Sequence, residues 1–170
     1  MSDRFYNFCW IGLWLILTVS SLLSRPLLPL DETRYVGVAW EMWTHGDFLV
    51  PHLNGEPYSH KAPLLFWLVH FGWFVLGVND WWPRLMPALF ALGSLFLTAH
   101  IARHLWPHRP EVAQLVPIVL LGTSIWIIYT PAMMFDMILV FWVLAAVAGL
   151  LAAAQSRRTR GWIVFSFAMA

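Results

Sequence analysis

Four charged residues have side chains that can do chemistry on a phosphate ester. Asp31 and Arg34 lie three residues apart, Lys61 follows in the same polar stretch, and Asp136 sits between two apolar segments. A cation stabilises the charge that grows on a phosphate leaving group, and does so well in a low-dielectric site. A carboxylate accepts the proton of an attacking hydroxyl, whereas paired carboxylates hold a divalent metal that clamps the phosphate. If the four residues converge, their types suit transfer from a sugar phosphate.

Each of these residues also has a structural explanation. Asp31 has the type and position of a helix N-cap, and Glu32 in the first turn would complement the helix dipole. Arg34 and Lys61 can extend their charged groups to lipid phosphates. An acid such as Asp136 costs roughly 2.5–3.5 kcal/mol at the centre of a membrane helix and is a functional candidate by default. Capping of the following helix is its alternative role.

The composition indicates which elements must position these residues. The 170 residues are 60% hydrophobic and only 11% charged, with 12 Trp and 12 Phe, whereas a soluble domain is about a quarter charged. Aromatic residues gather at bilayer interfaces. The formal net charge of +1 gives no indication of nucleic-acid binding, and the single Cys9 excludes an internal disulfide framework. We expect an all-α, multi-pass membrane protein.

Charge-free apolar runs approach the 20 or so residues that are needed to cross a bilayer. We predict membrane helices at about 6–24, 83–104, 111–129 and 137–155, and the start of another span at 161. The first is interpreted as an uncleaved signal anchor, because no small-residue cleavage site follows it. The last segment supplies only half a span, so we expect the chain to be the N-terminal part of a larger protein whose C-terminal remainder is missing.

The apolar run 62–79 decides the topology, because the orientation of every later segment reverses if it crosses the membrane. Short cytoplasmic loops collect Lys and Arg. If 62–79 does not cross, five arginines share the cytoplasmic side with Arg4; these are Arg103, Arg109, Arg157, Arg158 and Arg160. If it crosses, all five fall outside. We therefore predict an extracytoplasmic loop over residues 25–81, with 62–79 lying in the membrane interface.

This loop is predicted to contain two interfacial helices. In residues 31–45 apolar side chains recur at helical spacing, and Gly46 suits the end of that helix. Residues 50–60 read as turns, since they contain Pro51, Asn54-Gly55 and Pro57. The second helix is the run after Lys61. Together the two helices would give an apolar flank beside the charged residues, as a polyprenyl chain requires.

Several short motifs occur in this loop in a fixed order. They are Asp31-Glu-Thr-Arg-Tyr, Trp40-Glu-Met, Gly46-Asp-Phe-Leu-Val-Pro, Leu53-Asn-Gly-Glu-Pro-Tyr and Lys61-Ala-Pro-Leu-Leu-Phe-Trp-Leu. This series resembles the first periplasmic loop of the bacterial aminoarabinose transferases of lipid A and of their relatives in the protein O-mannosyltransferase superfamily. The similarity covers about residues 25–105 well and stays collinear to 156. It implies the N-terminal part of a GT-C glycosyltransferase fold, an undecaprenyl-phosphate sugar donor and an inverting transfer.

The resemblance also implies roles for single residues. The family's first-loop aspartate falls on Asp31, as the catalytic base or its metal partner, and the second essential acid falls on Asp136. The lysine that binds the donor phosphate falls on Lys61. The other substrate-binding residues that it implies are Glu32, Arg34, Tyr35 and Tyr58.

The sequence therefore predicts a glycosyltransferase of the bacterial inner membrane with its catalytic loop on the extracytoplasmic side. Its expected partners are a polyprenyl-phosphate sugar donor, lipid A or another envelope lipid or glycan as acceptor, and membrane lipids; a divalent metal ion is left open. Because transporters place acids and bases similarly, a flippase-like subunit that moves lipid-linked sugars without chemistry is the alternative. A noncatalytic scaffold is a third.

Overall fold

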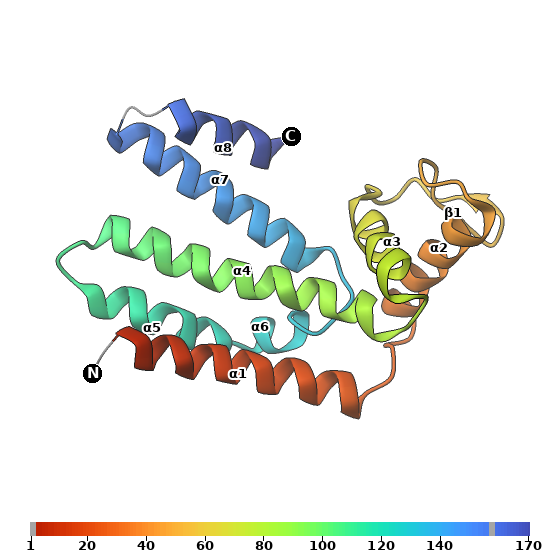
Figure 1. Cartoon of the computed structure of the whole chain (residues 1–170), viewed down its shortest axis with the longest axis horizontal. Helices are drawn as coiled ribbons and strands as arrows, with labels where there is room; N and C mark the ends of the chain where they lie inside the picture. The colour runs from red at the N-terminus through yellow and green to blue at the C-terminus, as the bar shows by residue number, and fades with distance from the viewer. Residues whose placement is uncertain (1–2, 157–158) are drawn as a thin grey trace.

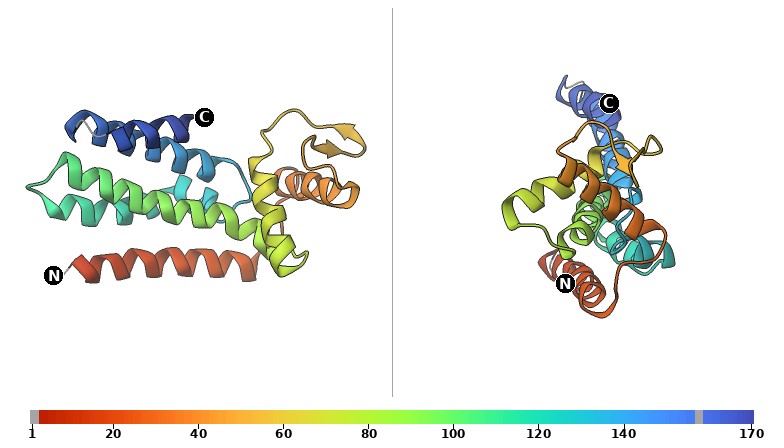
Figure 2. Two further views of the ribbon diagram at one scale, coloured as in Figure 1. Left: turned by 45° about the horizontal axis from the view of Figure 1, so that its top comes forward. Right: turned by 90° about the vertical axis from the view of Figure 1, so that its right-hand side faces the viewer.

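The computed structural model describes residues 3–156 and 159–170, which form a helical bundle with a smaller module at one end (Figure 1). The bundle consists of α1 (Asp3–Ser24), α4 (Trp81–Leu105), α5 (Pro110–Leu121), the short α6 (Ser124–Tyr129), α7 (Asp136–Ser156) and α8 (Thr159–Met169). We call residues 25–80 the loop module. It contains α2 (Asp31–His45), α3 (Leu64–Leu76), and a small hairpin of β1 (His52–Leu53) and β2 (Glu56–Pro57). Helix α1 begins at the opposite end of the bundle (Figure 2).

The bundle has the apolar character that the composition predicts. Among the described residues, two helices are long and apolar enough to cross a membrane, namely α4 and the stretch Asp136–Gln155 of α7. Helix α4 packs against α1, α5 and α7, around a core that includes Trp10, Trp14 and Leu95. Helices α7 and α8 approach closely through Gly149 and Gly161: a Cβ at Gly149 would lie 2.8 Å from a backbone nitrogen of α8. Small residues at such contacts are typical of helix packing in membranes.

Helix α2 forms over the residues predicted from the spacing of its apolar side chains. Tyr35, Val38, Ala39 and Met42 are all buried, so that one stripe faces the rest of the module. The helix ends at Gly46, which has the left-handed φ of 72° and whose N–H bonds to the carbonyl of Met42. The prediction of this helix and of its glycine end is confirmed.

The turn-like stretch predicted at 50–60 contains the hairpin. Asn54 and Gly55 both have positive φ, 55° and 82°, as the two central residues of a type I′ turn require. The Glu41 carboxylate accepts hydrogen bonds from both of their backbone N–H groups, and this ties the turn to α2. Backbone bonds to Glu41, first from Gly55, hold the pKa of this carboxyl below its usual value.

Helix α3 lies across the end of the bundle rather than along it (Figures 1 and 2). Its 13 residues are about 20 Å long at 1.5 Å per residue, which is short of the roughly 30 Å hydrocarbon core of a bilayer. His70, in its middle, is buried against α2 and its Nε2 lies 2.9 Å from the carbonyl oxygen of Ala39. Burial lowers the pKa of His70, and the Ala39 contact offsets this in part.

The single helix predicted over 111–129 is wrong, because the structure has α5 and α6 in its place. Thr123 takes an extended conformation, and its side chain accepts a hydrogen bond from Trp126 N as the N-cap of α6. The Thr123 hydroxyl also donates to Leu120 O at 2.7 Å. Thr123 thus ends one helix and starts the next, a local choice of hydrogen bonds that an apolar pattern does not reveal.

Gly72 allows α3 to sit directly on the start of α4. A Cβ at Gly72 would lie 1.7 Å from the indole nitrogen of Trp82, and that indole donates a hydrogen bond of 3.1 Å to the carbonyl of Leu68. Only a residue without a side chain lets the Trp82 ring reach the α3 backbone.

We expect Gly72→Ala to displace Trp82 and to lower the stability of the protein by about 1–3 kcal/mol, as overpacking does. Thermal unfolding of the purified protein in detergent measures this. Gly12→Ala is the matched control, because a Cβ there meets nothing within 4 Å. Equal melting temperatures for the two variants would show that the Gly72–Trp82 contact does not hold α3 in place.

Candidate functional site

Phe135 is the point at which the loop module meets the bundle. It belongs to the α6–α7 corner, residues 130–135, which precedes α7. The ring of Tyr35 meets it edge-on with centroids 5.2 Å apart, the ring of Phe66 lies at 5.8 Å, and the ammonium nitrogen of Lys61 lies 5.5 Å from its centroid. A cation over an aromatic face is attracted by the ring quadrupole. Side chains from α2, α3 and the segment before α3 therefore gather on one residue of the corner.

Asp136, the first residue of α7, follows Phe135 directly and its side chain is exposed. An acid in the first turn of a helix is favourable, because the N-terminal end of the helix dipole is positive. Lys61 is exposed as well. The structure thus places the loop cation over the ring of the residue that precedes the second acid, and both charged side chains are exposed.

Asp31 and Arg34 form an ion pair at the start of α2. Arg34 Nη2 lies 2.6 Å from Asp31 Oδ1, and the two side chains are 40% and 49% exposed. The N-cap role of Asp31 is wrong, because Leu30 occupies the N-cap position and Asp31 is already helical. Burial alone would lower the pKa of Arg34, but Tyr58, Tyr35 and Asp31 together raise it.

The two tyrosines implied by the loop motifs flank this ion pair. Tyr35 is 3% and Tyr58 8% exposed, and both belong to the core cluster of the loop module. Tyr58 is held by its N–H bond of 2.7 Å to the carbonyl of Pro51, immediately after the hairpin. The rings are therefore fixed by packing, whereas the charged groups beside them stay accessible.

Glu32 has a different surrounding from the substrate contact that the resemblance implies. Its side chain is fully buried and accepts two hydrogen bonds from Arg25, at 2.7 and 3.0 Å. It also accepts from Leu28 N at 2.6 Å and from Met133 N at 2.7 Å. A carboxylate has about four acceptor positions, and here protein groups use all of them. Glu32 therefore connects chain segments beneath the site and is not exposed to a ligand.

Arg25 completes this contact and was not singled out in the sequence. Its Nη2 donates to Glu32 Oε1 and also to the carbonyl of Pro131, at 2.8 Å. Burial would raise the pKa of Glu32, but the hydrogen bonds from Arg25, Leu28 and Met133 outweigh it and the pKa is lowered. The carboxylate is thus held in its charged form.

The metal alternative for Asp31 finds no ligand set in the part of the chain that the structure describes. Residues 3–156 and 159–170 contain no group of three His, Cys, Asp or Glu side chains placed to hold an ion. One oxygen of Asp31 is already engaged by Arg34.

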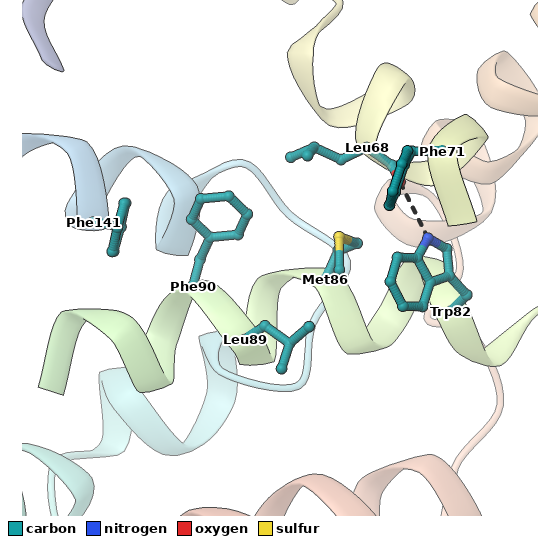
Figure 3. Close-up of a pocket in the computed structure, with 7 residues that line it drawn as sticks. All are labelled: Leu68, Phe71, Trp82, Met86, Leu89, Phe90 and Phe141. Carbon is teal, nitrogen blue, oxygen red and sulfur yellow. Dashed lines mark hydrogen bonds between the residues drawn. The ribbon is translucent and has the colours of Figure 1, made fainter. Parts of the chain in front are cut away.

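An apolar groove lies between α3 and the bundle, as Figure 3 shows. Its volume is about 310 Å³. It is lined by Leu68 and Phe71 from α3, by Trp82, Met86, Leu89 and Phe90 from α4, and by Phe141 from α7. The dashed line in the figure is the bond from Trp82 to Leu68 that seats α3. Helix α3, which follows Lys61, thus forms one wall of this groove.

The sequence profile of the dolichyl-phosphate-mannose-protein mannosyltransferase family matches residues 10–170. The chain belongs to this family. It is 29% identical to undecaprenyl phosphate-alpha-4-amino-4-deoxy-L-arabinose arabinosyl transferase 2 of Pseudomonas fluorescens Pf0-1, over 99% of this chain and 31% of that protein. With the transferase of the same name from strain Pf-5 it shares 35% identity, over 56% of this chain and 17% of that one.

Solved structures show the same fold. ArnT from Cupriavidus metallidurans, crystallised with undecaprenyl phosphate, matches with a TM-score of 0.84 and 25% identity, over 99% of this chain and 32% of that chain. Its apo form matches with a TM-score of 0.81. The chain therefore spans about a third of the length of these family members. The predicted fold class, the N-terminal part of a GT-C membrane fold, and the resemblance read from the loop motifs are both confirmed.

The lowered pKa of Glu32 leads us to expect that the stability of the protein depends on pH. Because its pKa is lowered in the folded state, the unfolded chain binds a proton more readily, and stability is full above the unfolded pKa of about 4.5 and is lost as the pH falls below it. We expect the melting temperature to fall more steeply between about pH 5 and 3.5 in the unmodified protein than in Glu32→Gln. Glu56→Gln, which alters an exposed loop acid, is the control. Parallel pH profiles for all three proteins would contradict this role of Glu32.

Proposed function

We propose that this chain forms the donor-binding N-terminal part of a glycosyltransferase that takes its sugar from a polyprenyl-phosphate carrier. The observation that carries the proposal is the position of Lys61 over Phe135, since it brings the loop cation beside the residue that precedes Asp136. The ArnT structure bound to undecaprenyl phosphate and the arabinosyl transferases among the relatives support this choice of donor.

Lys61 would hold the phosphate of the donor. Its ammonium group is exposed while one side faces the Phe135 ring, so a phosphate can approach from the open side. As the bond between the anomeric carbon and the phosphate oxygen breaks, its electron pair moves to the phosphate and the negative charge there grows. A fixed cation at that position stabilises the leaving group more in the transition state than in the ground state.

Asp31 would accept the proton of the acceptor hydroxyl. Arg34 binds Oδ1 and so orients the carboxylate, whose half-exposed position leaves its other oxygen available. The hydroxyl oxygen attacks the anomeric carbon from the face opposite the phosphate, its proton passes to the carboxylate, and the configuration is inverted. Asp136 would assist from the start of α7, by orienting the sugar or the acceptor. Tyr35 and Tyr58 would shape the pocket around the ion pair.

The isoprenoid part of the carrier would lie in the groove of Figure 3. The lining is almost entirely aromatic and aliphatic, and burial of each CH₂ of a prenyl chain contributes roughly 0.8 kcal/mol. Because α3 follows Lys61 and contributes Leu68 and Phe71 to the groove, one element would join phosphate binding to chain binding.

The proposed orientation places the loop module outside the bacterial inner membrane. The α4–α5 turn, with Arg103 and Arg109, lies at the far end of the bundle from the loop module (Figure 1). Short cytoplasmic loops are enriched in arginine, which favours the far end as the cytoplasmic one. The acceptor on the outer side would be lipid A or another lipid or glycan of the cell envelope.

We expect Asp31→Asn in the full-length protein to lower the turnover number by about 10²–10⁴-fold, the usual contribution of a general base. Binding of the carrier lipid should survive, because Asp31 does not contact the phosphate in this proposal. Transfer of radiolabelled sugar in proteoliposomes measures the first and tryptophan quenching the second. Glu56→Gln is the control. Full transfer activity in Asp31→Asn would refute the assignment, and sugar flux without a new glycosidic bond would favour the transporter instead.

Lys61→Ala should weaken binding of undecaprenyl phosphate about 10–100-fold, which corresponds to roughly 1.5–3 kcal/mol for a contact between charged groups. Lys61→Arg should retain most of the affinity because it keeps the charge. Arg109→Ala, at the far end of the bundle, is the matched control and should bind like the unmodified protein. If Arg109→Ala lost as much affinity as Lys61→Ala, the phosphate site would not be at Lys61.

A further inference from the structure

We propose that Arg25 and Glu32 are positioning residues whose ion pair, with its carboxylate buried and its guanidinium partly exposed, fixes the α6–α7 corner, and with it Phe135 and Asp136, against the start of α2. This inference rests on the proposed function only in assigning a catalytic consequence. Its structural part concerns the relative position of two chain segments and can be measured without any assay of transfer.

The pair connects the two halves of the site through a few atoms. Glu32 is the neighbour of Asp31, and its Oε1 accepts the N–H of Met133, three residues before Asp136. Arg25 reaches the carbonyl of Pro131 in the same corner. Both residues of the pair thus bind the backbone of the corner directly, and a shift of the corner relative to α2 would break these hydrogen bonds together.

The corner's own backbone hydrogen bonds are local and do not fix it against α2. They run from Ala132 N to Tyr129 O at 3.4 Å and from Met134 N to Ala132 O at 2.8 Å. These bonds, like those from Thr130 N to Trp126 O and from Leu139 N to Phe135 O, span four residues or fewer, so they shape the turn but leave its direction free. The bonds to Arg25 and Glu32 cross 106 and 101 residues of sequence, and they add directed long-range restraints to the packing of Phe135 against Tyr35 and Phe66.

The same carboxylate also determines how the chain enters α2. Leu28 N and Arg25 both bind Glu32, so that residues 25–32 fold around the buried oxygens. Leu30, which lies between Leu28 and Glu32, has φ 76° and ψ −61°, the conformation of a γ-turn with positive φ, which is strained for a residue with a Cβ. Such strain persists where the surrounding structure over-determines it. The Glu32 contacts supply that constraint immediately before Asp31.

Burial of the Glu32 carboxylate is a costly way to gain stability, since apolar residues in place of a buried ion often stabilise a protein equally well. Apolar residues could not accept the hydrogen bond from Met133 N or donate the hydrogen bond to Pro131 O. The geometry therefore points to position rather than to stability as the contribution of this pair. The lowered pKa of Glu32 agrees, because only the charged carboxylate accepts at every contact.

The test is a distance measurement between α2 and α7 in the full-length protein. Spin labels at Thr44→Cys and Leu139→Cys, both exposed positions, report the separation by electron paramagnetic resonance, with Cys9 replaced by Ser. We expect a narrow distribution in the parent and a broadened or shifted one in Glu32→Gln. Arg25→Lys keeps the charge but loses the two-pronged contact, so we expect a smaller change in the distance distribution. This variant still tests the proposal if Glu32→Gln does not fold.

Kinetics of the same variants give the catalytic consequence. A misplaced carboxylate should lower kcat by about 30-fold or more, since misplacement by 1 Å can cost 10²-fold, with the KM for the donor changed less than threefold. Glu41→Gln is the matched control: this acid also accepts two backbone N–H groups, but in the hairpin, and it should leave both readouts unchanged.

The outcomes separate the two proposals. An unchanged distance distribution in Glu32→Gln and Arg25→Lys overturns the positioning role, whatever the activity. A changed distribution with kcat within threefold of the parent overturns its catalytic consequence. If the parent protein transfers no sugar but the distance distribution still changes in the variants, the positioning role is supported and the proposed function fails.

Discussion

A carboxylate with no exposed surface lies at the junction between the loop module and the bundle. Removal of a charged group from water costs several kcal/mol unless charge and hydrogen bonds replace the water. Glu32 meets that requirement with a guanidinium and two backbone N–H groups from different segments. Because those segments are the exit from α1, the entrance to α2 and the α6–α7 corner, satisfying one buried charge also brings Asp31 toward the residue before Asp136. Phe135 then offers its ring to Tyr35, Phe66 and Lys61.

The chain divides sharply into an apolar bundle and a charged end. The bundle leaves large side chains such as Val119 and Leu139 about two-thirds exposed, as a surface in contact with lipid requires, whereas six of the nine acids lie in the loop module. A polyprenyl-phosphate sugar has the same division between an apolar chain and a charged head. The apolar groove of α3, α4 and α7 is connected to two of the charged residues near Phe135, because α3 follows Lys61 and α7 begins at Asp136.

The elements that rest on periodicity could be predicted from the sequence. The spacing of Tyr35, Val38 and Met42 predicted α2, because burial of one helix face dictates that pattern; α3 was predicted from the continuous apolar run after Lys61. The break at Thr123 could not be predicted, since it depends on which backbone groups a single hydroxyl binds. Asp31 was expected as an N-cap, but the chain enters α2 through Leu30 in a conformation that no local propensity favours.

The contacts between the residues of the site were harder to predict than the residues themselves. Asp31, Lys61 and Asp136 carry charge in an apolar sequence and are visible at once. Phe135 has no such signal, because an aromatic residue in an apolar run looks like its neighbours. Glu32 was recognised as an acid of the motif, but its contact with Met133 spans 101 residues and joins it to a backbone group, for which the sequence has no pattern.

The most direct test is a structure of the full-length protein with undecaprenyl phosphate bound. We expect the phosphate within hydrogen-bond distance of Lys61 Nζ, beside Phe135 and out of contact with the Asp31 carboxylate, with the prenyl chain along the groove of Leu68, Trp82 and Phe141. A phosphate bound at the opposite end of the bundle, near Arg103 and Arg109, would contradict this expectation.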